Sequence, residues 1–292
     1  MRAGDWMNYE ERFDAVAAHI SDHLSEPLDL VRLAEVAGLS PKHWHRVFTS
    51  AFGESLAALV KRLRLQQAAF LLATTDLPTA DIAATCGYPN VASFTRAFSA
   101  VYELPPGRYR AAGTHMAFAR ARTTFDPVAF TVEIRQVAPI DCLAVAHRGP
   151  YLNIGDAFRD LQVWISANSF DWDAQQLFGV FLDDPTRSPE AELRSLACLP
   201  RPTDFTDRPR SLAVGAAEIV DWSIDGGTYA VLRHEGPYSD MPAKYKWLFG
   251  CWVVASGHQL AELPVVERYL GPPHVTGPNH LLTEMWLPLQ GA

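Results

Sequence analysis

Two segments of the chain, about fifty positions apart, repeat the same order of turn and helix residues. Each has a turn glycine, an apolar residue and a polar helix start, followed by an arginine and, two positions later, a phenylalanine. The segments span residues 38–48 and 87–98, and the matching side chains are Arg46 with Arg96 and Phe48 with Phe98. A short amphipathic stretch, at 30–37 and 79–86, precedes each segment. A helix, a glycine turn and a second helix form the helix-turn-helix pattern, whose second helix can lie in a DNA major groove. Two copies in one chain are far more specific than one.

A long helical pattern joins the two units. Ser55 is a helix N-cap residue, and apolar side chains follow at helical spacing to about Thr74, ahead of Pro78. Some 20 residues at about 1.5 Å each span about 30 Å. That length is close to the ~34 Å between successive major-groove faces of B-DNA. The sequence therefore predicts an all-α N-terminal domain in which a linker helix holds two helix-turn-helix motifs in adjacent grooves.

Charge is distributed unevenly along the 292 residues, a length that suits about two domains. Residues 1–112 hold 11 Lys/Arg and 12 Asp/Glu, whereas 113–292 hold 14 and 21. Between Ser40 and Arg64, however, five cations accompany one anion, a local patch suited to phosphates. The acidic C-terminal part is a poor DNA binder and suits cationic partners better.

The cysteines are widely spaced and include no CxxC pair, which is typical of a reduced, cytosolic protein rather than of a disulfide framework. They are Cys86, Cys142, Cys198 and Cys251. The N-terminus lacks a secretory signal, and no apolar run approaches 18 residues. We therefore expect a cytoplasmic protein with no membrane partner.

Residues 8–112 resemble the DNA-binding domain of the AraC/XylS family. The resemblance rests on the paired motifs and on the closing run GYPNVASFTRAFSAVYELPPGRYR, at Gly87–Arg110. It implies two helix-turn-helix units that read an asymmetric promoter site in double-stranded DNA. It also makes RNA polymerase a candidate partner, and we expect a monomer or a weak dimer.

The same resemblance assigns DNA contacts by position. The groove-facing residues are Lys42, His45 and Arg46 in the first unit and Val91, Ala92, Ser93 and Arg96 in the second. The expected phosphate contacts are Ser40, Lys61, Arg62, Asn90 and Thr95, although Lys61 and Arg62 also fit a solvated face. The expected core residues are Trp44, Phe48, Phe94 and Phe98. Both arginines could be bidentate to guanine, whereas Val91 and Ala92 can offer only van der Waals contact, for instance to thymine methyls.

The pattern of the chain changes after residue 112. Residues 113–126 show no clean periodicity and are interpreted as a linker, and strand-like alternation begins at 130–134. The segment AVAHRGPY at 144–151 recurs as VLRHEGPY at 231–238, and an amphipathic helix pattern follows each copy. The sequence therefore predicts an α+β C-terminal domain of duplicated strand–strand–helix units, with a pseudo-two-fold groove between its halves.

Residues 127–292 resemble the GyrI-like small-molecule-binding domain. The motifs are HRGPY, FGVFLDDP, GGTYAVLRHEGPY, PVVERYL and LLTEMWLPL, found in that order from His147 to Leu289. The resemblance implies an effector-binding fold that takes bulky, apolar, often cationic molecules.

The family's ligand-binding acid maps onto Glu284, which lies in an otherwise apolar strand pattern. A carboxylate is costly to bury unless it is paired, and a lipophilic cation could pair with it. Aromatic faces would add cation–π attraction. The aromatic candidates are Trp222, Tyr229, Trp252, Tyr269 and Trp286, each of which also fits ordinary core packing. Glu267 in PVVERYL is interpreted as structural.

These features favour a transcription regulator controlled by a hydrophobic or cationic effector. A hydrolase of lipophilic compounds, in which Glu284 would polarise a water, and a module that titrates a partner protein remain as alternatives. We predict no catalytic residues, metal site or cofactor, since the sequence shows no nucleophile–base pair, metal-ligand cluster or phosphate loop.

Overall fold

The helix-turn-helix units form as the sequence predicts, because glycine provides the turns. The computed structural model describes residues 12, 15–16, 19–20, 23–26, 30–167, 175–202, 213–214, 217–271 and 276–291. The first unit pairs α2 (Leu30–Val36) with α3 (Pro41–Phe52), and the second pairs α5 (Thr79–Thr85) with α6 (Val91–Tyr102). Gly38 and Gly87 have φ of 63° and 71°, a left-handed conformation that side chains disfavour. A Cβ at Gly87 would also lie 2.8 Å from the Arg64 guanidinium.

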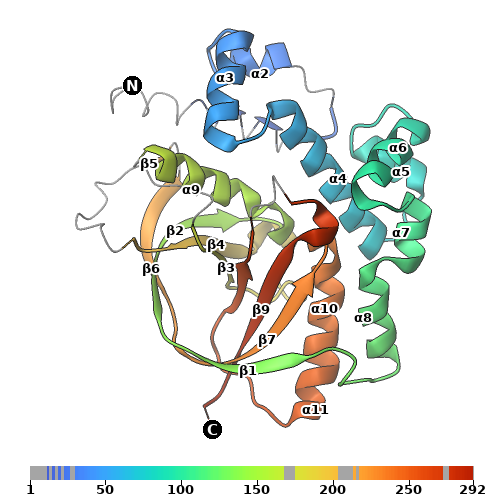
Figure 1. The fold of residues 1–292 in the computed structure, drawn as a ribbon, viewed down its shortest axis with the longest axis vertical. Helices are drawn as coiled ribbons and strands as arrows, with labels where there is room; N and C mark the ends of the chain where they lie inside the picture. The colour runs from blue at the N-terminus through green and yellow to red at the C-terminus, as the bar shows by residue number, and fades with distance from the viewer. Residues whose placement is uncertain are drawn as a thin grey trace.

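The linker helix α4 (Leu56–Thr74) connects the two units as one continuous helix (Figure 1). Ser55 caps it, since its Oγ accepts a hydrogen bond from the Ala58 amide at 3.2 Å. The second unit has its own core, which includes Leu65 and Leu72 of α4 together with the buried Phe94 and Phe98. The expected core role of both phenylalanines is confirmed.

The first unit shares its core with the C-terminal domain. Trp44 and Phe48 are buried, as expected, and belong to one apolar cluster with Leu161 and Trp164 of α9 (Gly155–Ala167). Helix α3 accordingly packs against α9. The first helix-turn-helix unit therefore packs directly against the C-terminal domain and shares an apolar core with it.

The segment interpreted as a linker, 113–126, contains a helix. After α7 (Pro106–Ala112), α8 (Thr114–Thr123) packs against α10 (Met241–Trp247), and the two run side by side in Figure 1. Its buried side chains are His115, Phe118 and Ala121. This buried stripe is short and begins with a histidine, so no clear apolar periodicity marks the helix in the sequence.

In the described part of the C-terminal domain, nine antiparallel strands form one sheet, in the order β1-β7-β9-β8-β3-β4-β2-β6-β5. The bounds are β1 Val132–Val137, β2 Ile140–Arg148, β3 Leu177–Phe181, β4 Arg194–Pro200, β5 Ala213–Val214, β6 Ala217–Ile224, β7 Gly227–Glu235, β8 Val265–Tyr269 and β9 Leu282–Leu289. Read outward from the central β3–β8 pair, both halves have the same connectivity. Strand β2 leads through α9 to β3 and β4, and β7 leads through α10 to β8 and β9. The outermost long strands are exchanged, since β1 pairs with β7 and β6 pairs with β2.

The two faces of the sheet are both apolar but have different neighbours. On β9, Met285 and Leu287 pack in a cluster with Trp247 of α10, whereas Trp286 packs in the cluster of the other face with Phe178. Successive side chains of a strand point to opposite faces, so position along β9 decides which face a residue reaches. Beyond α10 the helix continues as a π-helical stretch, Leu248–Val253, and α11 (Val254–Ser256).

Candidate DNA interface and effector cavity

Helix α6 presents its predicted reading residues at the surface. Val91 is 40% exposed, and Ala92 and Arg96 are also exposed, whereas Ser93 and Thr95 are half-buried. The Ser93 Oγ donates to the Asn90 carbonyl oxygen at 2.9 Å, which reduces its availability for a base.

Asn90, expected at a phosphate, has a structural function that the prediction did not include. Its Oδ1 accepts a hydrogen bond from the Ser93 amide at 2.8 Å and so caps α6. The side-chain nitrogen is the part of Asn90 that this cap leaves for a phosphate.

In the first unit, α3 contains the predicted reading residues in its first two turns. His45 is exposed, whereas the preceding residue, Trp44, is buried. Ser40 immediately precedes α3 and is exposed. The side chains of Lys42 and Arg46 lie outside the described part of the structure, so their predicted contacts stay predictions.

Three cations of α4 have different environments. Lys61 is exposed, as a phosphate contact requires. Arg62 does not fit that prediction, because it pairs with Glu54, Nη2 to Oε1 at 2.5 Å, and lines the cavity between α4, α9 and α10. Arg64 donates to the carbonyl oxygens of Leu24 at 2.8 Å and Gly87 at 3.3 Å. It thereby ties the chain ahead of the first unit to the turn of the second.

A cavity of about 1590 Å³ opens between α4, α9 and α10, above the centre of the sheet. Its walls are rich in aromatic rings: Phe52, Phe70, Tyr151, Phe158, Phe181, Tyr238, Tyr245, Phe249 and Tyr269. The charged residues among the described lining are seven acids and four bases. The acids are Glu54, Asp156, Asp183, Asp184, Glu190, Glu262 and Glu267, and the bases are Arg62, Arg122, Arg159 and Lys246. Two of these bases are neutralised within the wall, Arg62 by Glu54 and Arg159 by Asp156.

Glu267 on β8 is the buried carboxylate of this cavity, and it is 6% exposed. Its Oε1 accepts from the Tyr245 hydroxyl at 2.8 Å and its Oε2 from the Tyr269 hydroxyl at 2.9 Å. Burial raises the pKa of Glu267 to about 7, although both tyrosine hydrogen bonds lower it. Burial raises the pKa values of Tyr245 and Tyr269 well above the usual range, so both hydroxyls stay protonated donors.

The neighbouring strand leaves space for this arrangement. Gly179 on β3 is the cross-strand partner of Glu267. A Cβ at Gly179 would lie 2.9 Å from the Tyr269 hydroxyl oxygen, so the glycine of the FGVF motif keeps that hydroxyl in reach of the carboxylate.

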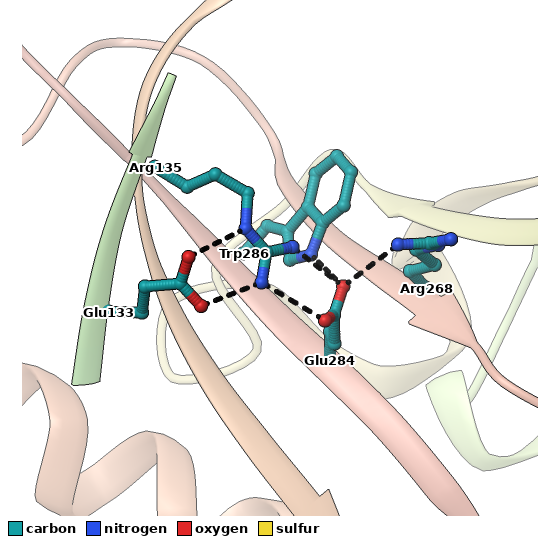
Figure 2. A network of polar contacts seen from close by, with 5 residues as sticks. All are labelled: Glu133, Arg135, Arg268, Glu284 and Trp286. Carbon is teal, nitrogen blue, oxygen red and sulfur yellow. Dashed lines mark hydrogen bonds and ion pairs between the residues drawn. The ribbon is translucent and has the colours of Figure 1, made fainter. Parts of the chain in front are cut away.

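The predicted ligand acid, Glu284, lies on the opposite face of the sheet, and the prediction is corrected on this point. Glu267 is the cross-strand partner of Met285, so it shares the helix-covered face, and Glu284, one residue before Met285, points the other way. Figure 2 shows what pairs with it there. Arg135 donates to both Glu284 oxygens, at 3.0 and 3.2 Å, and Arg268 and Trp286 donate to Oε2 at 3.4 and 3.0 Å.

This network already compensates the Glu284 charge. Burial alone would raise the pKa of Glu284, but the hydrogen bonds from Arg135 and Trp286 offset burial and hold that pKa below its usual value. Arg135 also binds Glu133 at the edge of the network. Glu284 is therefore a structural ion-pair residue, the role that the sequence had suggested for Glu267.

Of the predicted aromatic candidates, Tyr269 lines the cavity and the others do not. Trp222, Tyr229 and Trp286 pack on the same face as Glu284, with the Tyr229 hydroxyl donating to the Asp225 carbonyl oxygen at 2.7 Å. Trp252 packs in the α10 cluster and stacks on His258. The aromatic rings that line the cavity are phenylalanines and tyrosines, and Tyr269 is the one predicted from the sequence. The tyrosines of the two GPY motifs, Tyr151 and Tyr238, also line it, and their recurrence in the sequence was the available signal.

Within the described residues, no group of three or more His, Cys, Asp or Glu side chains is placed to hold a metal ion. No helix in the described part of the chain combines the length and apolar character needed to cross a membrane.

Comparisons with known proteins assign both parts of the chain to families. Residues 130–290 match the GyrI-like small molecule binding domain, and residues 33–112 match a helix-turn-helix domain. The regulatory protein SoxS of Escherichia coli is 30% identical over 36% of this chain and 97% of its own length. The uncharacterized HTH-type transcriptional regulator YbfP of Bacillus subtilis is 35% identical over 36% of this chain, and the transcriptional regulator Rob of Salmonella typhimurium is 33% identical over 34%. These matches span only about a third of YbfP and Rob, 35% and 34% respectively. The chain belongs to the AraC family of transcription regulators and has a GyrI-like small-molecule-binding domain as its C-terminal part.

Proposed function

We propose that this protein regulates transcription by binding double-stranded DNA through α3 and α6, under the control of a bulky lipophilic cation bound in the cavity. The proposal that a cationic effector binds in the cavity rests on the environment of Glu267. A carboxylate that is 6% exposed needs a compensating partner when ionised, and its described partners are two neutral tyrosine hydroxyls.

A cationic ligand would supply the missing compensation. The described lining carries an excess of acids over bases, and its aromatic faces attract cations through their quadrupoles. The cavity volume also exceeds the common range of about 300–1,000 Å³ for small-molecule sites, so a bulky molecule fits.

The proposal that the protein binds DNA rests on the exposed face of α6 and on the length of α4. The 19 residues of α4 span about 28 Å, near one helical turn of B-DNA. Two reading helices on one chain reach two grooves without a second copy, so a monomer or weak dimer remains the expected state. RNA polymerase remains a candidate partner.

The effector half is tested with two probes of equal shape and opposite charge. Tetraphenylphosphonium should raise the melting temperature of the full chain at pH 8, because a ligand that binds the native state stabilises it, whereas tetraphenylborate should raise it far less. Glu267→Gln should remove most of the phosphonium shift, and Glu284→Gln, on the other face, should keep it. Equal shifts by the two probes, or an unchanged shift in Glu267→Gln, would refute the cationic effector.

A further inference from the structure

Helix α4, which belongs to the DNA-binding part, forms one wall of the effector cavity. Its lining side chains are Leu59, Arg62, Leu63, Gln66, Gln67 and Phe70. These positions recur at intervals of three and four residues, so they form one continuous face of the helix. The floor of the same cavity, including Glu267, belongs to the C-terminal domain.

The opposite side of α4 packs in the core of the second helix-turn-helix unit. Leu65, Ala68 and Leu72 are buried there. Gln66 and Gln67 are half-buried, uncharged polar residues on the cavity-lining face of α4. Helix packing between the units does not need two glutamines there, whereas a cavity wall accommodates them.

Contacts on both sides of the cavity keep α4 in this position. α4 packs against the 3-10 turn Tyr238–Asp240, and Tyr238 of this turn and Met241, the first residue of α10, also line the cavity. At the far end of the second unit, the Asn279 Nδ2 donates to the Tyr102 carbonyl oxygen at 3.0 Å. The cavity is thus bounded by both domains at once.

We infer that the effector is held between the two domains, and that Gln66 on α4 is a specificity-determining residue of the effector site. This inference rests on the proposed function, since it concerns the same lipophilic cation. A ligand that touches α4 contacts the helix that sets the spacing of the two reading helices. Its differential affinity for arrangements of that helix would then be the source of control over DNA binding.

The test places opposite charges on the α4 wall. Tetraphenylphosphonium affinity is measured by calorimetry at pH 8 on the full chain and on Gln66→Glu and Gln66→Lys. We expect the Glu variant to bind about fivefold more tightly and the Lys variant about fivefold more weakly, because a charge within the cavity acts directly on the cation. A loss of packing would weaken binding in both variants, so the opposite signs separate electrostatics from misfolding.

The matched controls are Thr74→Glu and Thr74→Lys, at an exposed position on the last turn of the same helix. Thr74 lies eight residues from Gln66, about 12 Å along the axis and beyond a Debye length of about 8 Å at physiological salt, so neither control should change the affinity by more than about twofold.

The outcomes distinguish the two proposals. If the wild-type chain does not bind the phosphonium, the proposed function itself fails. If it binds and Glu267→Gln weakens binding, but both Gln66 variants behave like the Thr74 controls, the effector site stands and the α4 wall is refuted.

Discussion

The Tyr109 hydroxyl donates a hydrogen bond to Asp240 Oδ1 at 2.9 Å, and this bond joins the DNA-binding part to the 3-10 turn that precedes α10. The Ser239 hydroxyl lies 2.7 Å from the same tyrosine oxygen, and His115 Nδ1 lies 3.2 Å from Asp240 Oδ1. Tyr109 also packs edge-on against Phe98 in the core of the second unit. A single side chain therefore connects that core to the segment that lines the effector cavity.

Tyr109→Phe should lower the free energy of unfolding by about 1–3 kcal/mol, because it removes the shorter of two hydrogen bonds to the fully buried Asp240 Oδ1 and leaves the contact with His115. The Asp240 Oδ2 already has no partner among the described residues, so little is available to replace the lost bond. Urea denaturation measures the change. Tyr88→Phe is the matched control, a half-buried tyrosine of the same unit, and should change stability by less than about 0.5 kcal/mol. Equal effects of both substitutions would show that the interdomain bond contributes nothing.

Glu267 and Glu284 show which parts of the fold and of the effector site could be predicted from the sequence. The order of motifs was sufficient to predict both domains and a site for a carboxylate with aromatic rings. It was insufficient to choose the carboxylate, because β9 is apolar on both faces and alternation does not reveal which face meets the helices. That choice depends on the register that pairs Glu267 with Met285 and with Gly179, and the sequence alone does not contain it.

The same limit applies to helices that meet the other domain. Arg62 and Lys61 are adjacent cations in the sequence, yet one faces the cavity and the other solvent. Long-range packing decides which face of α4 the C-terminal domain covers. Local sequence patterns do not contain this information.

Glu267→Gln should stabilise the protein at high pH but not at low pH. The folded state holds the Glu267 proton more tightly than the unfolded state, with a pKa of about 7 against 4.5. Stability from this group is therefore complete below pH 4.5 and is lost as the pH rises through 7, by about 3 kcal/mol in all. Urea titrations at pH 5 and pH 8 should show the variant gaining on the wild type across that interval. A constant difference would contradict the buried carboxylate.

Cation binding should follow the same titration with the opposite dependence. Deprotonated Glu267 is the form that attracts a cation, so tetraphenylphosphonium affinity should be highest at pH 8 and fall below pH 7, the pKa of Glu267, by up to about tenfold per pH unit. Calorimetry at pH 6, 7 and 8 measures it. Glu284→Gln should retain the pH dependence and Glu267→Gln should abolish it. Retention of the dependence in Glu267→Gln would assign the titration to another group.

DNA affinity should separate Lys61 from Arg62, two neighbouring cations with different surroundings. Lys61→Ala should weaken binding across sequences and reduce the slope of log affinity against log salt by about one, as expected for one lost phosphate contact. Arg62→Ala should leave that slope unchanged, because Arg62 pairs with Glu54 and faces the cavity. Arg96 of α6 is exposed, and we propose that it reads a base. Arg96→Ala should therefore cost about 1–3 kcal/mol for a duplex selected from a random library, with little effect on unselected DNA. Gel shifts at several salt concentrations measure all three variants, and a reduced slope for Arg62→Ala would place that arginine at the DNA.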